Sequence, residues 1–469
     1  MYESDLQDLR KLSLRDLCHP CGAVTRERGT KQPRAQLDRW GILRDLVVDA
    51  WLNPDDPPEG IARRHLEALS PIERDLVWKM FLNVGRILPR PQGVEIDVEG
   101  TSRYYDRVED GVATSVFISW TFSHPDGTRE HFRLKTGRSG TTEEEAALLW
   151  LEAEAGESFH DIMAWTGEVT DINPPPSLED RLIAVIRASP ALSDPRPQPG
   201  YYCVRCDRAA RCGAYPTGDG ERAPSYARTL NLTKTDLIDL ALCQRRVAWR
   251  RVHGIPYDDG DDPTETDELS RGIEFHRLLT VAHEGGDPAG KVEDFLRALP
   301  VSEVADFRQM WDNHLTLLQT EGLEVRRTEF PVGITLLQGE KQELRGATLI
   351  GFVDLTARDP HGHPAAVEVK TGTSLVSEVE NDLYALGMRR WLPSGEPVVI
   401  HRHHVRRNPP ECERFEYTDS DLVEAMSRLE ERISPALGWD WDDPLQPPYQ
   451  VGGWCQSCRH RGICSAYRS

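Results

Sequence analysis

The sequence predicts an α/β protein that contains two tandem copies of one unit, and three observations indicate this. A CxxC pair followed, after five intervening residues, by a third cysteine occurs twice, at 203–212 and 455–464. A Lys-Thr-Gly tripeptide after a strand-like run also occurs twice, at 135–137 and 370–372. A helix-like segment rich in Glu and Leu follows each tripeptide. Several features repeated in one order imply a duplicated unit.

Length and composition are those of a soluble globular protein. The chain has 469 residues, of which 39% are hydrophobic and 28% charged, and two or three domains of ~150 residues would account for it. The chain has no apolar run of about eighteen residues, and its N-terminus is charged. We therefore expect a cytoplasmic protein without a membrane partner. The net charge of −21 argues against a basic nucleic-acid coat protein. It is compatible with a nuclease, because a metal site is itself acidic.

The two units are expected at 1–215 and 229–469, with a linker at 216–228. The linker prediction rests on PTGDGERAPS, whose Gly, Pro and Ser residues are typical of loops. Early in each unit an amphipathic helix with a glycine near its start is predicted, at 37–48 and 269–283. Strand-like segments follow each of these helices.

The ten cysteines indicate metal or redox chemistry, because structural disulfides are rare in the cytoplasm. A CxxC lets two thiolates face one metal from a tight turn, and a distant cysteine can complete the site. Four thiolates suit an iron–sulfur cluster or zinc. The set in the second unit is Cys243, Cys455, Cys458 and Cys464. The set in the first unit is Cys203, Cys206 and Cys212, with Cys18 or Cys21 as the fourth member. Cys412 is interpreted as an ordinary cysteine.

An acid–acid–lysine pattern lies in GFVDLTARDPHGHPAAVEVKTGT, residues 351–373. Strands are predicted at 348–357 and 365–370, joined by a hairpin turn that places Asp354 near Glu368. The alternation of side chains along a strand puts Glu368 and Lys370 on one face. Carboxylates bind Mg²⁺ or Mn²⁺, and a lysine can orient a water and offset phosphate charge. This is equipment for metal-assisted hydrolysis of a phosphodiester.

Further candidate residues surround this pattern in the sequence. His276 follows Gly272 by four residues on a predicted helix. Glu329 lies on a predicted strand upstream, and Glu380 and Tyr384 are four residues apart, on one face of a predicted helix.

These motifs, taken in order, resemble the PD-(D/E)xK nuclease superfamily. Within it the second unit is similar to RecB-type nucleases that carry an iron–sulfur cluster, including the AddB nuclease domain and the CRISPR-associated adaptation exonuclease of that type. The resemblance covers nearly all of residues 230–469. It implies two restriction-endonuclease-like domains, each a central mixed sheet flanked by helices and closed by a four-cysteine metal cluster.

The resemblance also implies roles for individual residues. His276, Asp354 and Glu368 correspond to ligands of a divalent metal, with the Val369 carbonyl as a further ligand, and Lys370 corresponds to the catalytic lysine. The family often has Gln where this chain has Glu380. The cysteines of the second unit correspond to ligands of a [4Fe–4S] cluster that joins the C-terminal tail to the first helix of the domain. Zinc remains the alternative, and a second cluster is a candidate in the first unit.

The first unit departs from the pattern. Asp45 stands where the second unit has its histidine, and Asp106 is a candidate counterpart of Asp354. Arg133 replaces the glutamate while Lys135 remains. A cation beside Mg²⁺ would repel the ion, so this unit is predicted to have lost cleavage and kept its cysteine cluster. Arg133, Lys135 and Arg138 either bind a backbone phosphate or are surface charges.

The leading functional prediction is a metal-dependent DNA nuclease that acts on ends or single strands, such as an exonuclease. DNA repair, CRISPR adaptation and phage defence are all compatible with it. The sequence has no GxxxxGK[ST] phosphate loop, so a helicase partner would have to be another chain. The alternative is a catalytically silent subunit that binds DNA ends or acts as a scaffold.

Overall fold

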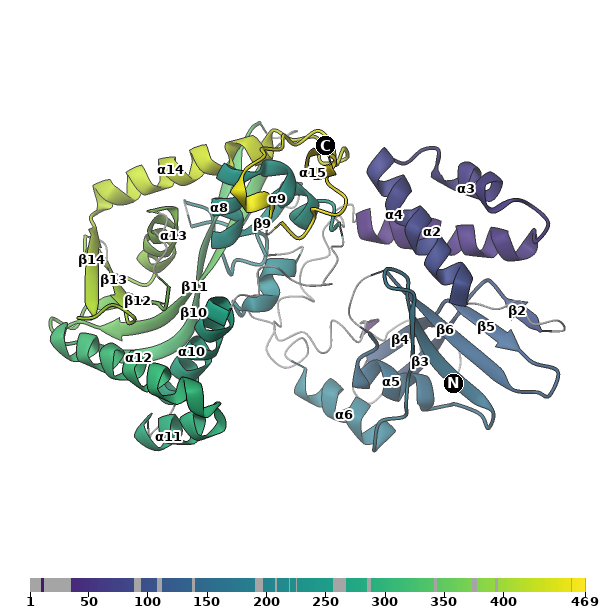
Figure 1. The fold of residues 1–469 in the computed structure, drawn as a ribbon, viewed down its shortest axis with the longest axis horizontal. Coiled ribbons are helices and arrows are strands. Elements are labelled where there is room, and N and C mark those ends of the chain that lie inside the picture. The colour runs from purple at the N-terminus through teal and green to yellow at the C-terminus, as the bar shows by residue number, and fades with distance from the viewer. Residues whose placement is uncertain are drawn as a thin grey trace. The chain divides into compact units, whose positions relative to one another are not determined.

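The computed structural model divides into two compact units (Figure 1). Unit 1 comprises 1–198, 252–256 and 441–445, and unit 2 comprises 199–251, 257–440 and 446–469. The structure describes residues 10–11, 35–87, 94–107, 112–136, 140–189, 197–206, 209–218, 220–224, 226–255, 267–284, 288–340, 344–372, 378–392, 395–456 and 458–468. None of the described helices is long and apolar enough to span a membrane.

The division between the units falls at residue 198, earlier than the predicted boundary at 215. Residues 199–215 pack with unit 2 because their backbone is bonded to it. The Asn231 amide donates to the carbonyl oxygens of Cys203 and Cys206 at 3.0 and 2.6 Å. The Thr335 hydroxyl donates to the Tyr215 carbonyl at 2.7 Å. The middle cysteine set therefore belongs to unit 2 in space.

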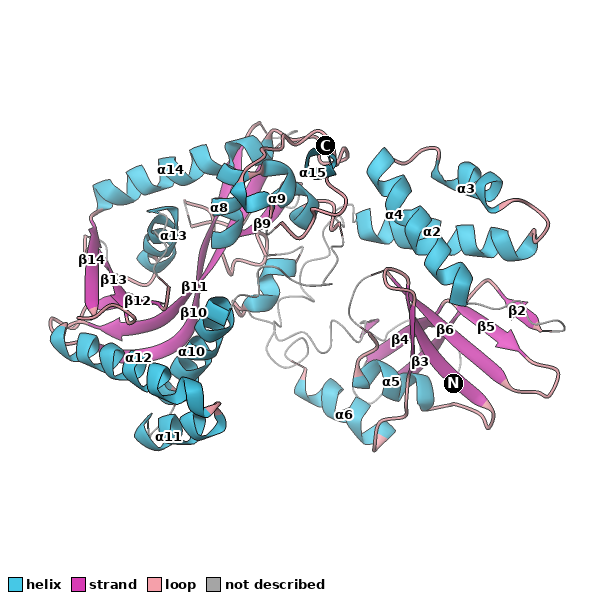
Figure 2. Cartoon of the chain, viewed as in Figure 1, coloured by secondary structure: helices cyan, strands magenta, loops and turns pink. Residues whose placement is uncertain are grey.

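Unit 2 is built on a six-stranded mixed sheet with the path β10-β11-β12-β13-β14, and β9 pairs with β11 (Figure 2). Its strands are β9 (Arg228–Thr233), β10 (Glu324–Gln338), β11 (Arg345–Arg358), β12 (Pro364–Lys370), β13 (Val398–His404) and β14 (Glu411–Tyr417). The β12–β13 and β9–β11 pairs are parallel and the other pairs are antiparallel. The predicted hairpin is confirmed, with Leu355 opposite Val367.

Helices cover both faces of this sheet. They are α8 (Lys234–Leu242), α9 (Gln244–Arg251), α10 (Asp267–His283), α11 (Pro288–Ala298), α12 (Val301–Thr320), α13 (Glu378–Arg389), α14 (Asp419–Leu437) and α15 (Ser465–Arg468), with short 3₁₀ turns η3 (Tyr201–Arg205) and η4 (Gly453–Cys455). Helices α10, α11 and α12 share one apolar core with Val367 and Val369 of β12. The alternation along β12 turns Glu368 and Lys370 to the other face, where they meet α13.

Unit 1 contains a five-stranded sheet, β2-β5-β6-β7-β8, and a three-stranded sheet, β1-β4-β3. The strands are β1 (Arg10–Lys11), β2 (Glu95–Asp97), β3 (Thr101–Arg107), β4 (Val112–Ile118), β5 (Trp120–Ser123), β6 (Arg129–Lys135), β7 (Glu157–Met163) and β8 (Glu168–Asp171). The helices are α2 (Ala35–Leu52), α3 (Pro58–Leu66), α4 (Pro71–Ile87), α5 (Glu143–Trp150) and α6 (Leu178–Ala188).

The two larger sheets share one pairing pattern. In unit 1, β5–β6 is antiparallel, β6–β7 is parallel with α5 between the strands in sequence, and β7–β8 is antiparallel. In unit 2, β11–β12, β12–β13 and β13–β14 repeat that order, with α13 in the place of α5. The two larger sheets are thus mixed sheets flanked by helices, with one strand order in common. The long β10–β11 hairpin distinguishes unit 2.

A chain of three histidines lies against the sheet of unit 2 on the α12 side. His314 Nε2 is 3.2 Å from His283 Nε2, and its Nδ1 is 3.3 Å from His403 Nδ1. Burial lowers the pKa of His283 to about 4. Burial and the two neighbouring histidines hold the pKa of His314 well below its usual range.

We expect unit 2 to lose stability as the pH falls from about 6.5 to about 4. The folded-state pKa values lie below the unfolded value, so the unfolded chain takes up protons first and is favoured on acidification. His283 alone accounts for up to about 3 kcal/mol of unfolding free energy over this range. Urea unfolding at a series of pH values measures the effect, and His283→Phe should flatten the profile. His361→Ala, at an exposed position, is the control. An unchanged profile in His283→Phe would contradict the assignment.

Candidate active site

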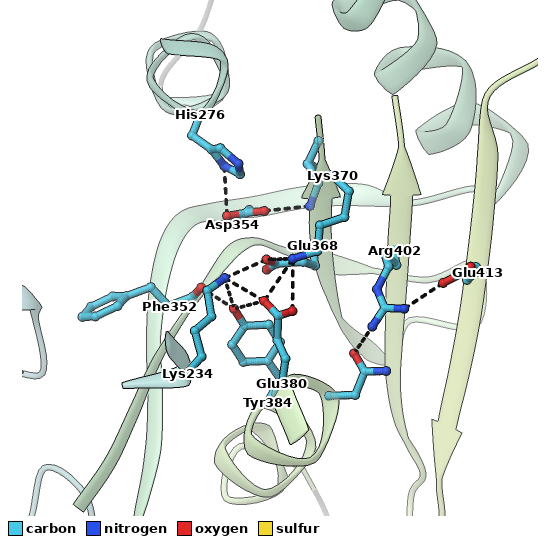
Figure 3. Close-up of polar contacts among 12 residues, drawn as sticks. Lys234, His276, Phe352, Asp354, Glu368, Lys370, Glu380, Tyr384, Arg402 and Glu413 are labelled. Atoms are coloured by element: carbon cyan, nitrogen blue, oxygen red, sulfur yellow. Dashed lines mark hydrogen bonds and ion pairs between the residues drawn. The ribbon is translucent and has the colours of Figure 1, made fainter. Parts of the chain in front are cut away.

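The acid–acid–lysine residues lie together on two adjacent strands of unit 2 (Figure 3). Because Leu355 of β11 faces Val367 of β12, the register places Asp354 beside Glu368. The backbone N–H of Val369 donates to Asp354 Oδ2 at 2.7 Å. That hydrogen bond fixes one carboxylate oxygen of Asp354.

Glu368 and Lys370 form a tight ion pair on the α13 face of the sheet. The Lys370 ammonium donates to Glu368 Oε1 at 2.8 Å and to both carboxylate oxygens of Glu380 at 3.0 and 3.1 Å. Glu368 is 2% exposed. Burial and the Asp354 charge oppose its ionisation, but the ammonium groups of two lysines bring the pKa of Glu368 below its usual range. It is therefore a buried anion.

His276 reaches the same point from α10. Its Nδ1 is 3.1 Å from Asp354 Oδ1. Burial disfavours the charged ring, yet the Asp354 carboxylate raises the pKa of His276 above its usual value. Gly272, one turn earlier, lets α10 approach the strand end, because a Cβ there would lie 3.0 Å from Thr371 Oγ1. This contact explains the spacing of Gly272 and His276 in the sequence.

Lys234 was missed by the sequence analysis. It is the first residue of α8, and its ammonium donates to Glu368 Oε1 at 2.9 Å, Glu380 Oε1 at 2.7 Å and the Tyr384 hydroxyl at 3.0 Å. Burial alone would lower the pKa of Lys234, but the surrounding acidic groups, Glu368 foremost, raise it well above its usual value. A lysine at a helix N-terminus is disfavoured by the helix dipole. This position was the one signal in the sequence that Lys234 needs acidic partners.

Glu380 and Tyr384 support the site from α13, as their spacing predicted. The Tyr384 hydroxyl donates to the Phe352 carbonyl at 3.1 Å and lies 3.3 Å from Glu380 Oε1. Both side chains are buried. Their contacts hold the ammonium groups of Lys234 and Lys370 in place from the α13 side.

Glu329 lies beside the site with a strained backbone. Its φ is 44°, a left-handed conformation that costs a non-glycine residue on the order of 1–3 kcal/mol. Burial and the Asp354 charge raise the pKa of Glu329, and His276 opposes them. Glu329 is therefore a third carboxylate close to Asp354 and His276.

The arrangement fits a divalent cation. Among the described residues, Glu368 Oε2 is buried and has no hydrogen-bond partner. A buried carboxylate oxygen left without a partner is costly, and a metal ion would satisfy it. The nearby Asp354 carboxylate is a hard ligand of the kind that Mg²⁺ and Mn²⁺ prefer, and the His276 imidazole is a borderline ligand.

The C-terminal cysteines gather against the end of α8. Cys243 follows the last residue of α8. Two contacts hold the C-terminal tail there. The Arg245 backbone N–H donates to the Pro448 carbonyl at 3.0 Å, and the Trp249 ring packs edge-on against His460. Burial raises the pKa of Cys458, and the neighbouring thiols of Cys243 and Cys464 add to the shift.

The middle set also clusters. Burial raises the pKa of Cys203 to about 12, with contributions from Cys206 and Cys212. Their candidate fourth partners, Cys18 and Cys21, lie outside the described residues.

The corresponding place in unit 1 is filled by protein groups. Arg133, Lys135 and Glu145 have the spacing of Glu368, Lys370 and Glu380. Arg133 Nη1 is 3.1 Å from Glu145 Oε2, and Lys135 is 3.5 Å from the same oxygen. The Arg133 side chain is 9% exposed. Arg133 and Lys135 share one internal carboxylate and are not surface charges. Arg138, the third cation of that prediction, lies outside the described residues.

Ser119, and not Asp106, takes the place of Asp354. The Leu134 N–H donates to Ser119 Oγ at 2.9 Å, as the Val369 N–H donates to Asp354. Asp106 is on β3, in the other sheet. The Leu134 carbonyl, which corresponds to that of Val369, accepts a 3.0 Å hydrogen bond from the Trp40 indole.

The Asp45 side chain, expected to take the place of His276, is 63% exposed. Its recorded ion pair is with Arg44, at 3.7 Å. The pseudo-site of unit 1 thus has a serine and an arginine where unit 2 has two carboxylates.

Comparison with known proteins finds one family model and two solved structures with similarity to this chain. The model of the PD-(D/E)XK nuclease superfamily matches residues 231–465, half of the chain. Among solved structures, SSO0001 is similar at 16% identity, with 50% of this chain and 86% of that chain covered and a TM-score of 0.24. A candidate exonuclease from Eubacterium rectale is similar at 14% identity, with 51% and 87% covered and a TM-score of 0.30. No curated protein matches the sequence.

Proposed function

Because the chain belongs to the PD-(D/E)XK nuclease superfamily, we propose that it is a divalent-metal-dependent DNA nuclease whose catalytic site is in unit 2. The substrate would be single-stranded DNA or DNA ends, and the reaction exonucleolytic hydrolysis of the phosphodiester. The observation that carries the proposal is the buried, unpartnered Oε2 of Glu368 beside Asp354, with Lys370 held on the other oxygen of Glu368.

Asp354, Glu368, His276 and the Val369 carbonyl would hold Mg²⁺ or Mn²⁺. The ion supplies Lewis-acid stabilisation of the phosphate and a more acidic water. Lys370, clamped between Glu368 and Glu380, is placed to orient the attacking water and to offset phosphate charge. Lys234 stays protonated and neutralises the same two glutamates, which keeps Glu368 ionised. Glu329 adds negative potential from β10.

An exposed aromatic ring beside the carboxylates favours single-stranded DNA. Tyr201 is 59% exposed and stacks on Phe352 with ring centroids 3.8 Å apart. Partial burial is the main reason that the pKa of Tyr201 is raised, and the negative charges of Glu329 and Asp354 raise it further. The ring therefore lies within the field of the site. Unpaired bases stack on such rings regardless of sequence.

Unit 1 would serve as a silent arm that grips DNA or docks a partner, because its pseudo-site lacks both carboxylates. A helicase or a defence protein is the partner class that fits a nuclease acting at ends. DNA repair, CRISPR adaptation and phage defence are the settings in which such an enzyme would work. The competing candidate is a scaffold subunit that binds ends without cleaving them, and the intact Glu368–Lys370 pair speaks against it.

Mn²⁺-dependent degradation of labelled single-stranded DNA tests the enzyme proposal. We expect Lys370→Ala to lower the rate about 10²-fold, in line with the loss of one positioned charge. Lys135→Ala removes the corresponding lysine of unit 1 and should leave the rate unchanged. Equal activity in wild type and Lys370→Ala would indicate a contaminating nuclease and would contradict the assignment.

We also propose that Cys243, Cys455, Cys458 and Cys464 hold a [4Fe–4S] cluster, and that Cys203, Cys206 and Cys212 hold a second one with Cys18 or Cys21. Zinc is the alternative metal for these thiolate sets, because four thiolates suit either. Each cluster would have a structural role.

Anaerobic purification distinguishes the two metals. The protein should be brown, with broad absorbance at ~400 nm. It should contain about eight iron atoms per chain if two clusters are present and about four if one is present. Cys458→Ser should remove about four irons. A colourless protein with stoichiometric zinc at these cysteines would overturn the cluster assignment.

A further inference from the structure

A second group of metal-ligating side chains lies apart from the nuclease site and from both cysteine sets. Glu321 follows the last turn of α12, His401 is on β13, and Cys412 is on the edge strand β14. One ligand atom from each of the three lies within 4.8 Å of the other two. Among the described residues this is the one such group of three.

The thiol and the carboxylate converge on a single ring nitrogen. His401 Nδ1 is 3.6 Å from Cys412 Sγ and 3.7 Å from Glu321 Oε2. The other nitrogen, Nε2, is buried and pairs with no atom of the described chain. A catalytic Cys–His–Glu relay needs the thiol and the carboxylate on opposite nitrogens of the imidazole. Convergence on one nitrogen is instead the arrangement of ligands around a common centre.

The two separations measured from His401 Nδ1 match those around a tetrahedral ion. Zinc bonds of about 2.3 Å to sulfur and about 2.0–2.2 Å to nitrogen and oxygen place the ligand atoms roughly 3.3–3.6 Å apart. The observed 3.6 and 3.7 Å need little adjustment, and 3.7 Å is too long for a direct hydrogen bond. His401 is 3% exposed, so its ring is held in place by packing.

We propose that Glu321, His401 and Cys412 bind one Zn²⁺ ion. A thiolate, an imidazole and a carboxylate form a typical set for this borderline-soft cation. Water would fill the fourth position, since the Glu321 side chain is 29% exposed and solvent can reach it. The ion would join the end of α12 to the hairpin β13–β14, in which β14 is the edge strand of the described sheet. Thiolate and carboxylate together neutralise the charge of the ion.

Zinc content of the full-length protein tests this proposal independently of nuclease activity. After exposure to Zn²⁺ and removal of loosely bound metal, wild type should hold one more zinc per chain than Cys412→Ala. Glu321→Gln should weaken binding of that zinc at least ~10-fold, since it removes a charged ligand. Glu416→Gln, an exposed acid on the same strand paired with Arg414, is the matched control and should keep the full zinc content.

Thermal unfolding gives a second readout. Added Zn²⁺ should raise the Tm of wild type and Glu416→Gln and have no such effect on Cys412→Ala. If Cys412→Ala fails to fold, Glu321→Gln decides the question, because its side chain lies at a partly exposed helix end. Equal zinc content and equal Tm shifts in wild type and Glu321→Gln would overturn the proposal, as would loss of the zinc in Glu416→Gln.

Discussion

Asp354→Asn is expected to lower the rate of metal-dependent DNA degradation about 10³-fold, at the upper end for loss of one electrostatic group in an active site. The change is isosteric, and the amide oxygen can still accept the Val369 N–H that now bonds Oδ2 at 2.7 Å. What is lost is the negative charge between His276 and Glu368. An amide is a weaker ligand for a hard divalent ion than a carboxylate.

The measurement is kcat/KM on end-labelled single-stranded DNA across a range of Mn²⁺ concentrations. Ser119→Ala changes the corresponding position of unit 1 and serves as the matched control, with no expected effect on rate. Circular dichroism and thermal melting should show that Asp354→Asn is folded. A rate within tenfold of wild type at all Mn²⁺ concentrations would remove Asp354 from the site.

The hairpin and its three polar residues could be predicted because they are local. A turn sequence between two strand-like runs sets the register, and the register places Asp354 beside Glu368. The position of His276 was also predictable in part, since Gly272 one turn earlier marks a close approach of the helix to a neighbouring residue, here the Thr371 side chain.

Lys234 could not be predicted because its partner lies far away in the chain. It is 134 residues from Glu368 in sequence, and the two meet because β9, which precedes α8, pairs with β11. A helix-starting lysine is common on surfaces, and its acidic surroundings exist only after the sheet has formed. The same limit applies to Ser119, whose equivalence to Asp354 rests on a hydrogen bond to the neighbouring strand.

Charge patterns in a sequence do not show burial, and two basic stretches illustrate this. The stretch 401–407 overlaps strand β13, which is buried along its whole length. Arg402 on that strand bonds to Asn381 and Glu413, each at 2.8 Å. In the stretch 244–254, Arg246, Arg250 and Arg251 pair with acidic residues of α8. These arginines are therefore structural.

Asp236 is the acid on which the second of these stretches converges, and it is fully buried. Arg250 Nε donates to its Oδ1 at 2.9 Å, and Arg251 Nε donates to its Oδ2 at 2.7 Å. Asp236 also closes a capping box with Thr233, whose N–H donates to Oδ2 at 2.7 Å. Burial opposes ionisation, but the two guanidinium groups hold the pKa of Asp236 below its usual value.

Asp236→Asn should therefore lower the free energy of unfolding of unit 2 by about 3–5 kcal/mol, because it leaves two guanidinium groups without their shared counter-charge in a buried place. The stabilisation that Asp236 provides is present above its unfolded pKa and is lost as the pH falls through the lower folded value, so the variant should lose less stability on acidification. Urea unfolding at pH 7 and at a series of pH values below about 4 measures both effects. Asp294→Asn, at a side chain 74% exposed, should change stability by less than about 0.5 kcal/mol.

A loss of unfolding free energy below about 1 kcal/mol in Asp236→Asn would mean that Asp239, 2.7 Å from Arg250 Nη2, satisfies the arginines by itself. The small loss would then come from the capping box.

A large loss has a further consequence. Helix α8 begins with Lys234 at the nuclease site and ends next to Cys243, so the clamp on Asp236 fixes the position of both ends. Destabilising it should lower nuclease activity and metal content at the C-terminal cysteines together, whereas Asp354→Asn should lower activity alone.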